Sequence, residues 1–122
     1  MKEMSLSNSE AYYTLEYRHG PMSLVDDKTM IILLANEATT DGDAKLLTQM
    51  KEYAAVTLVI GNTASGDFND ADYTLDMNYG YDSLQNAAMI GFIGQLMGYY
   101  MAEQKGLNAD TPRHLSQAIV IK

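Results

Sequence analysis

Two short, uninterrupted apolar runs limit the possible folds of this chain more than any other feature. They occupy residues 29–35 (TMIILLA) and 56–60 (VTLVI), and both are shorter than an ordinary helix. Because neither run alternates with polar residues, each indicates a parallel strand that is buried on both faces. The segment between them begins at a capping residue, Thr40 or Asp41, and then carries apolar residues at helical spacing. These are Leu46, Leu47, Met50 and Tyr53 or Ala54.

The elements that follow extend the same pattern. We expect a short strand at residues 73–76, a helix from Asp82 or Ser83 to about Gln104 and an extended segment at residues 118–121. Strands and helices in this order predict an α/β fold, a three-layer α/β/α sandwich with a parallel sheet. Residues 1–28 contain no buried first strand and open on what resembles a helix end (KEMSL). The predicted sandwich is therefore truncated at its N-terminus.

Composition and charge exclude several classes of partner. Sixteen acidic residues oppose eight Lys and Arg among 122 residues, a formal charge of -8 that disfavours nucleic acid and acidic membranes. There is no cysteine, and the polar residues after Met1 do not form a signal peptide, so a cytoplasmic protein is expected. Residues 86–102 are uncharged but too short and polar for a membrane span, which favours a buried helix.

Two stretches carry a resemblance to a known family. They are residues 2–21 (KEMSLSNSEAYYTLEYRHGP) and the tail at 106–122 (GLNADTPRHLSQAIVIK). Both resemble the second sugar-isomerase (SIS) domain of the isomerase half of glucosamine-6-phosphate synthase and of related phosphosugar isomerases and deglycases. The resemblance implies a flavodoxin-like fold, with residues 1–122 forming part of a second, C-terminal SIS domain. It also implies a tandem arrangement in which the first SIS domain cradles the sugar phosphate.

The resemblance implies a function in sugar-phosphate chemistry. The expected activity is aldose-ketose isomerisation, or fructosamine-phosphate deglycation, of a hexose or amino-sugar 6-phosphate. The chain lacks the phosphate-binding loop, because the glycine-spaced segment at 61–66 (GNTASG) has no following Lys and Ser or Thr. The isolated chain is therefore expected to be inactive. The alternatives are a non-catalytic module that senses phosphosugars and a truncated remnant that only dimerises.

Glu3 and His19 are the candidate catalytic residues. By resemblance, Glu3 in the Lys-Glu motif transfers the proton between adjacent sugar carbons, and His19 in the His-Gly-Pro block opens the ring. Histidine suits that role because it titrates near pH ~6.5. The competing interpretations are a solvated helix residue for Glu3 and a structural turn residue for His19. In the family this histidine reaches the neighbouring subunit's site, so the expected partner is a second copy or a sister SIS domain.

Other residues depart from the family pattern or admit a plainer interpretation. Gln117 stands where the synthase branch has a lysine that forms an imine, which favours the isomerase and deglycase branches. We expect no cofactor and no metal, because the two histidines are 95 residues apart and the acidic loop lacks the EF-hand glycine and glutamate. Glu10 is expected to be structural and Lys122 exposed. Glu16 and Arg18 either orient His19 or form a surface ion pair, and His114 either contacts a sugar hydroxyl or is an exposed turn residue. Apolar residues around the long helix also predict a partner: Met89, Phe92, Ile93, Leu96, Met97 and Tyr100.

Overall fold

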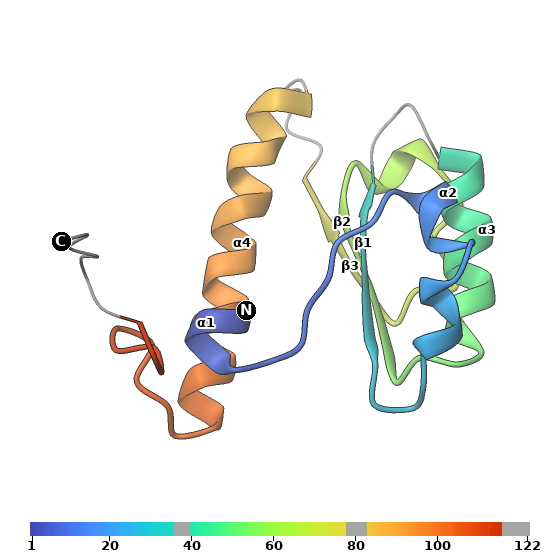
Figure 1. The fold of residues 1–122 in the computed structure, drawn as a ribbon. Helices are drawn as coiled ribbons and strands as arrows, with labels where there is room; N and C mark the ends of the chain where they lie inside the picture. Colours follow the sequence, from blue (N-terminus) through green and yellow to red (C-terminus); the bar gives the residue numbers. More distant parts are fainter. Residues whose placement is uncertain (36–39, 78–82, 116–122) are drawn as a thin grey trace, which may run out of the picture. The chain divides into compact units, whose positions relative to one another are not determined.

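The computed structural model describes residues 1–35, 40–77 and 83–115, which fall into two compact units. The sheet unit is Tyr12–Ala87, and the helical unit combines Met1–Ala11 with Ala88–Lys122. Figure 1 shows the elements of both units. In chain order they are α1 (Lys2–Ser5), α2 (Thr14–Tyr17), η1 (Pro21–Leu24), β1 (Met30–Ala35), α3 (Thr40–Lys51), β2 (Val56–Gly61), η2 (Thr63–Ser65), β3 (Tyr73–Asp76) and α4 (Ser83–Gln104).

The sheet unit contains the predicted parallel sheet. Its strands lie in the order β1-β2-β3, and the pairing aligns Leu33 with Val59 and Leu58 with Tyr73. The two apolar runs and the segment at residues 73–76 are therefore strands, as predicted. Helices α2 and α3 lie on the same side of this sheet (Figure 1). Under them, a small core brings together the strand residues Leu33, Ala35 and Val59 with Leu47 and Phe68.

Within the sheet unit, β1 is not buried on both faces as expected. Leu33 and Ala35 are buried, but Met30, Ile32 and Leu34 point to the opposite face and remain 43%, 38% and 48% exposed. Within the sheet unit, α3 packs on one face of the strands, so β1 is buried on one face only. β2 comes closer to the prediction, because every one of its residues is buried or half-buried.

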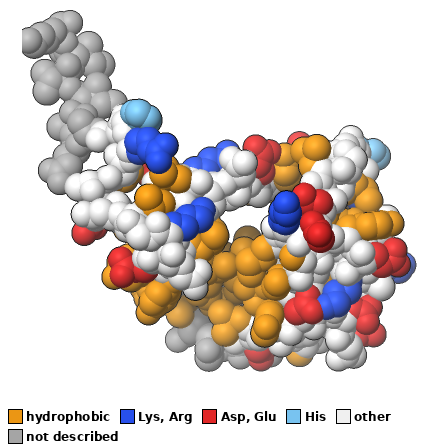
Figure 2. All heavy atoms as spheres, turned by 90° about the horizontal axis from the view of Figure 1, so that it is seen from below, with side chains coloured by type: hydrophobic (Ala, Val, Ile, Leu, Met, Phe, Trp, Pro, Cys, Tyr) orange, Lys and Arg blue, Asp and Glu red, His pale blue; other side chains and the backbone are white. Residues whose placement is uncertain are grey.

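The acidic loop before β3 is a structural element. Asp70 accepts a hydrogen bond from Thr48 Oγ1 at 2.6 Å, and Asp72 accepts from Lys51 Nζ and from the backbone and hydroxyl of Thr57. These bonds hold the loop against α3 and β2. Among the described residues no group of three or more His, Cys, Asp or Glu could hold a metal ion. Acidic side chains are scattered over the face shown in Figure 2.

The long helix α4 begins and ends where predicted. Gly106 adopts a positive φ of 67°, its N–H donates to Glu103 O, and the Leu107 N–H donates to Ala102 O. These two bonds form a Schellman motif, which explains the stop at Lys105-Gly106. No helix in the described part of the chain is long and apolar enough to cross a membrane. The predicted extended segment at 118–121 lies outside the described residues, as do Gln117 and Lys122.

Candidate functional site

Glu3 lies on α1, a single helical turn in the helical unit. The turn is closed at Ser5, whose N–H and Oγ both donate to Met1 O, at 3.1 Å and 2.8 Å. Ser5 is fully buried, whereas Glu3 is exposed. Leu6 follows in the left-handed conformation with φ 49°, which ends the helix. One turn of helix is too short to persist in water alone, so neighbouring contacts must hold Glu3 in place.

A glycine of α4 allows α1 to come close. A Cβ atom built on Gly98 would lie 3.3 Å from Met1 N and 3.3 Å from Met4 Sδ. Such contacts are tighter than nine in ten real Cβ contacts, so a larger residue at this position would require Met1 and Met4 to shift by a few tenths of an ångström. Gly98 thus allows the Glu3-bearing turn to lie close to α4.

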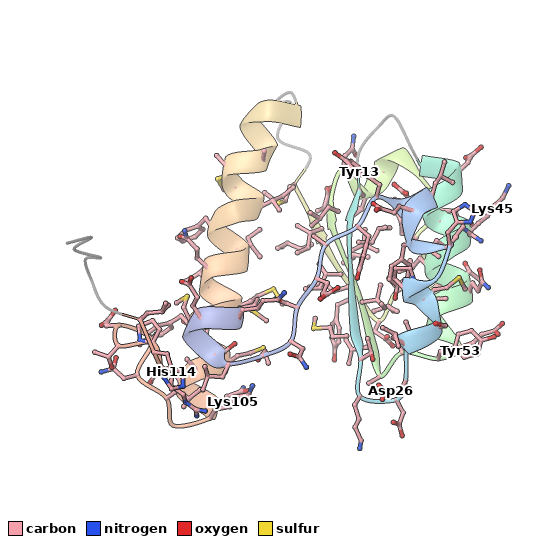
Figure 3. All side chains as sticks on the ribbon, viewed as in Figure 1. Tyr13, Asp26, Lys45, Tyr53, Lys105 and His114 are labelled. Atoms are coloured by element: carbon pink, nitrogen blue, oxygen red, sulfur yellow. The ribbon has the colours of Figure 1, made fainter. Side chains whose placement is uncertain are left out.

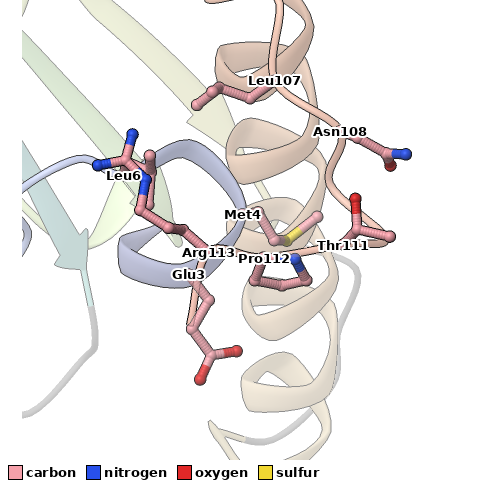
Figure 4. A pocket seen from close by; sticks show the side chains of 8 residues that line it. All are labelled: Glu3, Met4, Leu6, Leu107, Asn108, Thr111, Pro112 and Arg113. Atoms are coloured by element: carbon pink, nitrogen blue, oxygen red, sulfur yellow. The ribbon is translucent and has the colours of Figure 1, made fainter. Parts of the chain in front are cut away.

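Glu3 is at the wall of a pocket of about 300 Å³ within the helical unit. Four polar side chains contribute to this wall, namely Glu3, Asn108, Thr111 and Arg113 (Figure 4). Met4, Leu6, Leu107 and Pro112 supply its apolar part. The volume is at the lower end of the range for small-molecule sites, and a few polar groups lie on an apolar wall.

The loop after α4 carries most of the polar groups of this pocket. Asn108 Oδ1 accepts the Asp110 N–H at 2.9 Å, and Asn108 O accepts the Thr111 N–H at 3.3 Å, so the loop turns back on itself. In Figure 4 the Arg113 guanidinium points away from the Glu3 carboxylate. No ion pair joins these two side chains in the part of the chain that the structure describes.

His19 lies in the sheet unit, between α2 and η1. The side chain of His19 is exposed, and its backbone N–H donates to Glu16 O at 3.0 Å. Gly20 follows with φ 148°, a value that L side chains rarely adopt, and its carbonyl accepts both the N–H and the hydroxyl of Ser23. Pro21 then opens η1, where its fixed φ suits the first turn. The backbone on both sides of the imidazole is therefore fixed.

Two side-chain bonds fasten α2, and with it His19, to α3. Thr14 Oγ1 donates to Asp43 Oδ1, and Arg18 Nη1 donates to Gln49 Oε1 at 3.1 Å. Asp43 is 1% exposed, so this contact anchors α2 on a buried carboxylate. Tyr17, which closes α2, has its pKa raised by burial. The guanidinium of Arg18 thus contributes to the attachment of α2 to α3.

The chain is similar over its whole length to a group of metabolic enzymes. It is 32% identical over 124 residues to the isomerising glutamine–fructose-6-phosphate aminotransferase of Buchnera aphidicola, and 32% identical over 123 residues to that of Sulfolobus acidocaldarius. Each match covers 100% of this chain and 20% of the relative, so the chain spans about a fifth of their length. No protein-family model matches the sequence.

A solved structure has the same fold. The tagatose-6-phosphate ketose/aldose isomerase from Escherichia coli superposes with a TM-score of 0.75 at 22% identity, covering 96% of this chain and 34% of that chain. The resemblance to the SIS domain family is confirmed. The described sheet and helices correspondingly match the flavodoxin-like SIS architecture.

Within this SIS fold, the two predicted catalytic residues lie in different units. Glu3 belongs to the helical unit and His19 to the sheet unit. The structure describes each one within its own unit, so their meeting at one substrate stays a prediction. Glu10 forms an exposed ion pair with Lys2 at 3.8 Å.

The pocket residues of the tail were not singled out from the sequence. Asn108, Thr111 and Arg113 fall inside the stretch GLNADTPRHLSQ, which carried the resemblance but gave no individual roles. Only the fold brings them beside Glu3, because about a hundred residues separate them along the chain. His114 is exposed in the following turn with φ 64°, a conformation that histidine tolerates better than most residues.

Proposed function

We propose that residues 1–122 form part of the second SIS domain of a phosphosugar isomerase. The observation that carries this proposal is the similarity to isomerising aminotransferases over the entire chain, 32% in the Buchnera relative. The likeness in fold to a ketose/aldose isomerase supports the same class of reaction. Because the chain spans only about a fifth of those relatives, the first SIS domain and its phosphate cradle would come from elsewhere in the assembly.

The substrate in this proposal is a hexose or amino-sugar 6-phosphate. The pocket beside Glu3 offers an amide at Asn108 and a hydroxyl at Thr111, which are suitable partners for sugar hydroxyls. Its apolar wall, which includes Met4 and Leu107, suits the C–H faces of a sugar. A net charge of -8 gives the chain no general attraction for phosphate, which agrees with a cradle supplied by another domain.

Glu3 and His19 divide the chemistry in this proposal. His19 gives a proton to the ring oxygen and accepts one from the anomeric hydroxyl, which opens the sugar. Glu3 then takes a proton from C1 of the open-chain ketose to leave an enediolate, and returns it to C2, while the proton of the C1 hydroxyl passes to the C2 oxygen to give the aldose. Both side chains are exposed, as groups that must touch a substrate should be. A homodimer in the cytoplasm, with His19 serving the neighbouring subunit, completes the proposal.

Gln117 favours isomerisation or deglycation over amino transfer. An amide nitrogen does not form an imine with the open-chain sugar, so a route through a lysine at this position is closed. The proton transfer assigned to Glu3 does not need that lysine.

A chimera tests the proposal. This chain replaces the matching 124 residues of the Buchnera aminotransferase, and conversion of fructose 6-phosphate to the aldose is followed by proton NMR. We expect isomerisation in the chimera and its loss in His19→Asn. His114→Asn is the matched control, because the chain has two histidines and asparagine also tolerates the positive φ at position 114.

If His19→Asn is as active as His114→Asn and the parent chimera, His19 has no role in the reaction. The ¹⁵N-labelled 122-residue chain gives a second measurement, in which fructose 6-phosphate should shift the amide signals of Thr111 and Arg113. Because the phosphate cradle is supplied elsewhere, binding should be weak. The expected dissociation constant is about 1 mM or above, which corresponds to a binding free energy of about 4 kcal/mol at most. Saturable binding to an inactive chimera would favour the sensing module instead.

A further inference from the structure

A lysine at the end of α4 reaches the helical turn that carries Glu3. Lys105 Nζ donates to Ser5 O at 2.9 Å and to Ser7 Oγ at 2.7 Å. Figure 3 shows Lys105 beyond the end of α4, where the Schellman motif satisfies the carbonyls of Ala102 and Glu103. Its ammonium group therefore binds to the end of α1, a hundred residues earlier in the chain.

The hydroxyl groups of Ser5 and Ser7 extend this hydrogen bonding along the turn. Ser5 Oγ lies 2.9 Å from Ser7 Oγ and donates to Met1 O, the carbonyl at the other end of α1. A continuous hydrogen-bonded path thus runs from Lys105 through Ser7 and Ser5 to the first residue of the turn. Glu3 lies within the segment that this path spans.

The position of the ammonium is electrostatically favourable. Ser5 O is a terminal carbonyl of α1, and carbonyls at helix C-termini carry partial negative charge that a cation stabilises. Hydrogen bonds from a charged donor are shorter and stronger than those between neutral groups. Leu6 leaves the helix in the left-handed conformation at this same point, so the bond also holds a turn that Leu6 would otherwise disfavour.

We propose that Lys105 is a positioning residue for Glu3: with Ser5 and Ser7, it fixes the one-turn helix α1 so that the carboxylate is held at the wall of its pocket. This inference rests on the proposed function for its catalytic consequence. Gly98 allows the turn to lie close to α4, and Lys105 fixes the end of the turn. A displacement of about 1 Å in a reacting group can cost about a hundredfold in rate, so the turn needs both contacts.

The first test needs no catalysis. In the 122-residue chain, Lys105→Met should speed hydrogen exchange of the Ser5 amide at least about tenfold, because the turn opens more often. Lys105→Arg keeps a cation with several donors and should restore part of the protection. Lys45→Met is the matched control, because Lys45 is an exposed lysine of α3 in the sheet unit. Unchanged exchange at Ser5 in Lys105→Met would overturn the inference.

The second test measures turnover in the chimera. Lys105→Met should lower kcat about ten- to a hundredfold with KM changed less than about twofold, provided that the amide signals of α4 show the protein to be folded. Lys105→Arg should recover part of the loss. A full kcat in Lys105→Met together with a loss in Glu3→Gln would overturn the positioning role. A full kcat in Glu3→Gln would instead refute the proposed function, whatever Lys105 does to the turn.

Discussion

Replacing Gly61 by alanine should damage the sheet unit severely. Gly61 ends β2 with φ 131°, and a Cβ atom there would overlap the carbonyl oxygen of Ala35, its partner on β1. The unfavourable backbone conformation costs about 1–3 kcal/mol. Displacing the Ala35 carbonyl from its place in the ladder adds about 1 kcal/mol for the weakened hydrogen bonding. The sum, about 2–4 kcal/mol, is a large part of the stability of an ordinary domain, which is about 5–15 kcal/mol.

Urea unfolding of the full chain measures this cost. The transition should be followed through amide signals of the sheet unit, such as that of the buried Val59, because the two units need not unfold together. Gly42→Ala is the control, since a Cβ atom there meets nothing within 4 Å and the residue lies in α3. It should stabilise by up to about 1 kcal/mol. A Gly61→Ala cost below about 1 kcal/mol would refute the reasoning.

Three further predictions concern single contacts. Hydrogen bonds from Lys51 and then from Thr57 lower the pKa of Asp72 from 3.8 to about 2. The unfolded chain therefore binds the proton more readily than the folded chain. The stabilisation by the ionised Asp72 is complete above pH 3.8 and is lost as the pH falls toward about 2. In Asp72→Asn, the free energy of unfolding should not show this loss over the same pH range. Thr14→Val removes the donor to the buried Asp43 and should cost about 1–3 kcal/mol in urea unfolding. Thr63→Val should cost less, because among the described residues Thr63 bonds to Asp76 through its backbone N–H, which valine keeps. Gly98→Ala should speed hydrogen exchange at Ser5 without affecting Val59, and an unchanged Ser5 amide would show that α1 tolerates the extra methyl group.

Much of the fold could be predicted because its elements follow local rules. The run at residues 56–60 is continuous, short and followed by Gly61, which favours a buried strand. The Lys105-Gly106 pair ends α4 because glycine adopts φ 67° without strain. The burial of β1 could not be predicted in this way. Continuous apolar sequence indicates that both faces tolerate burial, but tertiary packing decides how many faces are covered, and Ile32 remains 38% exposed.

The candidate site was predictable only in part. Glu3 and His19 stand in short motifs that can be recognised along the chain. Helix α2 was missed, because a four-residue turn gives no periodic signal and depends on the Thr14–Asp43 contact. The role of Lys105 was also hidden, because a lysine beside a helix C-terminus ordinarily stabilises its own helix. Nothing local indicates that its ammonium reaches Ser5.

The central claim is that the carboxylate of Glu3 moves the proton between the sugar carbons. Its most direct test is deuterium incorporation at C1 of fructose 6-phosphate in D₂O, measured in the chimera with Glu3→Gln and with Glu103→Gln, an exposed acid of α4 outside the pocket. We predict exchange in the parent and in Glu103→Gln, and its loss by at least about a hundredfold in Glu3→Gln. Exchange at the parental rate in Glu3→Gln would contradict the account.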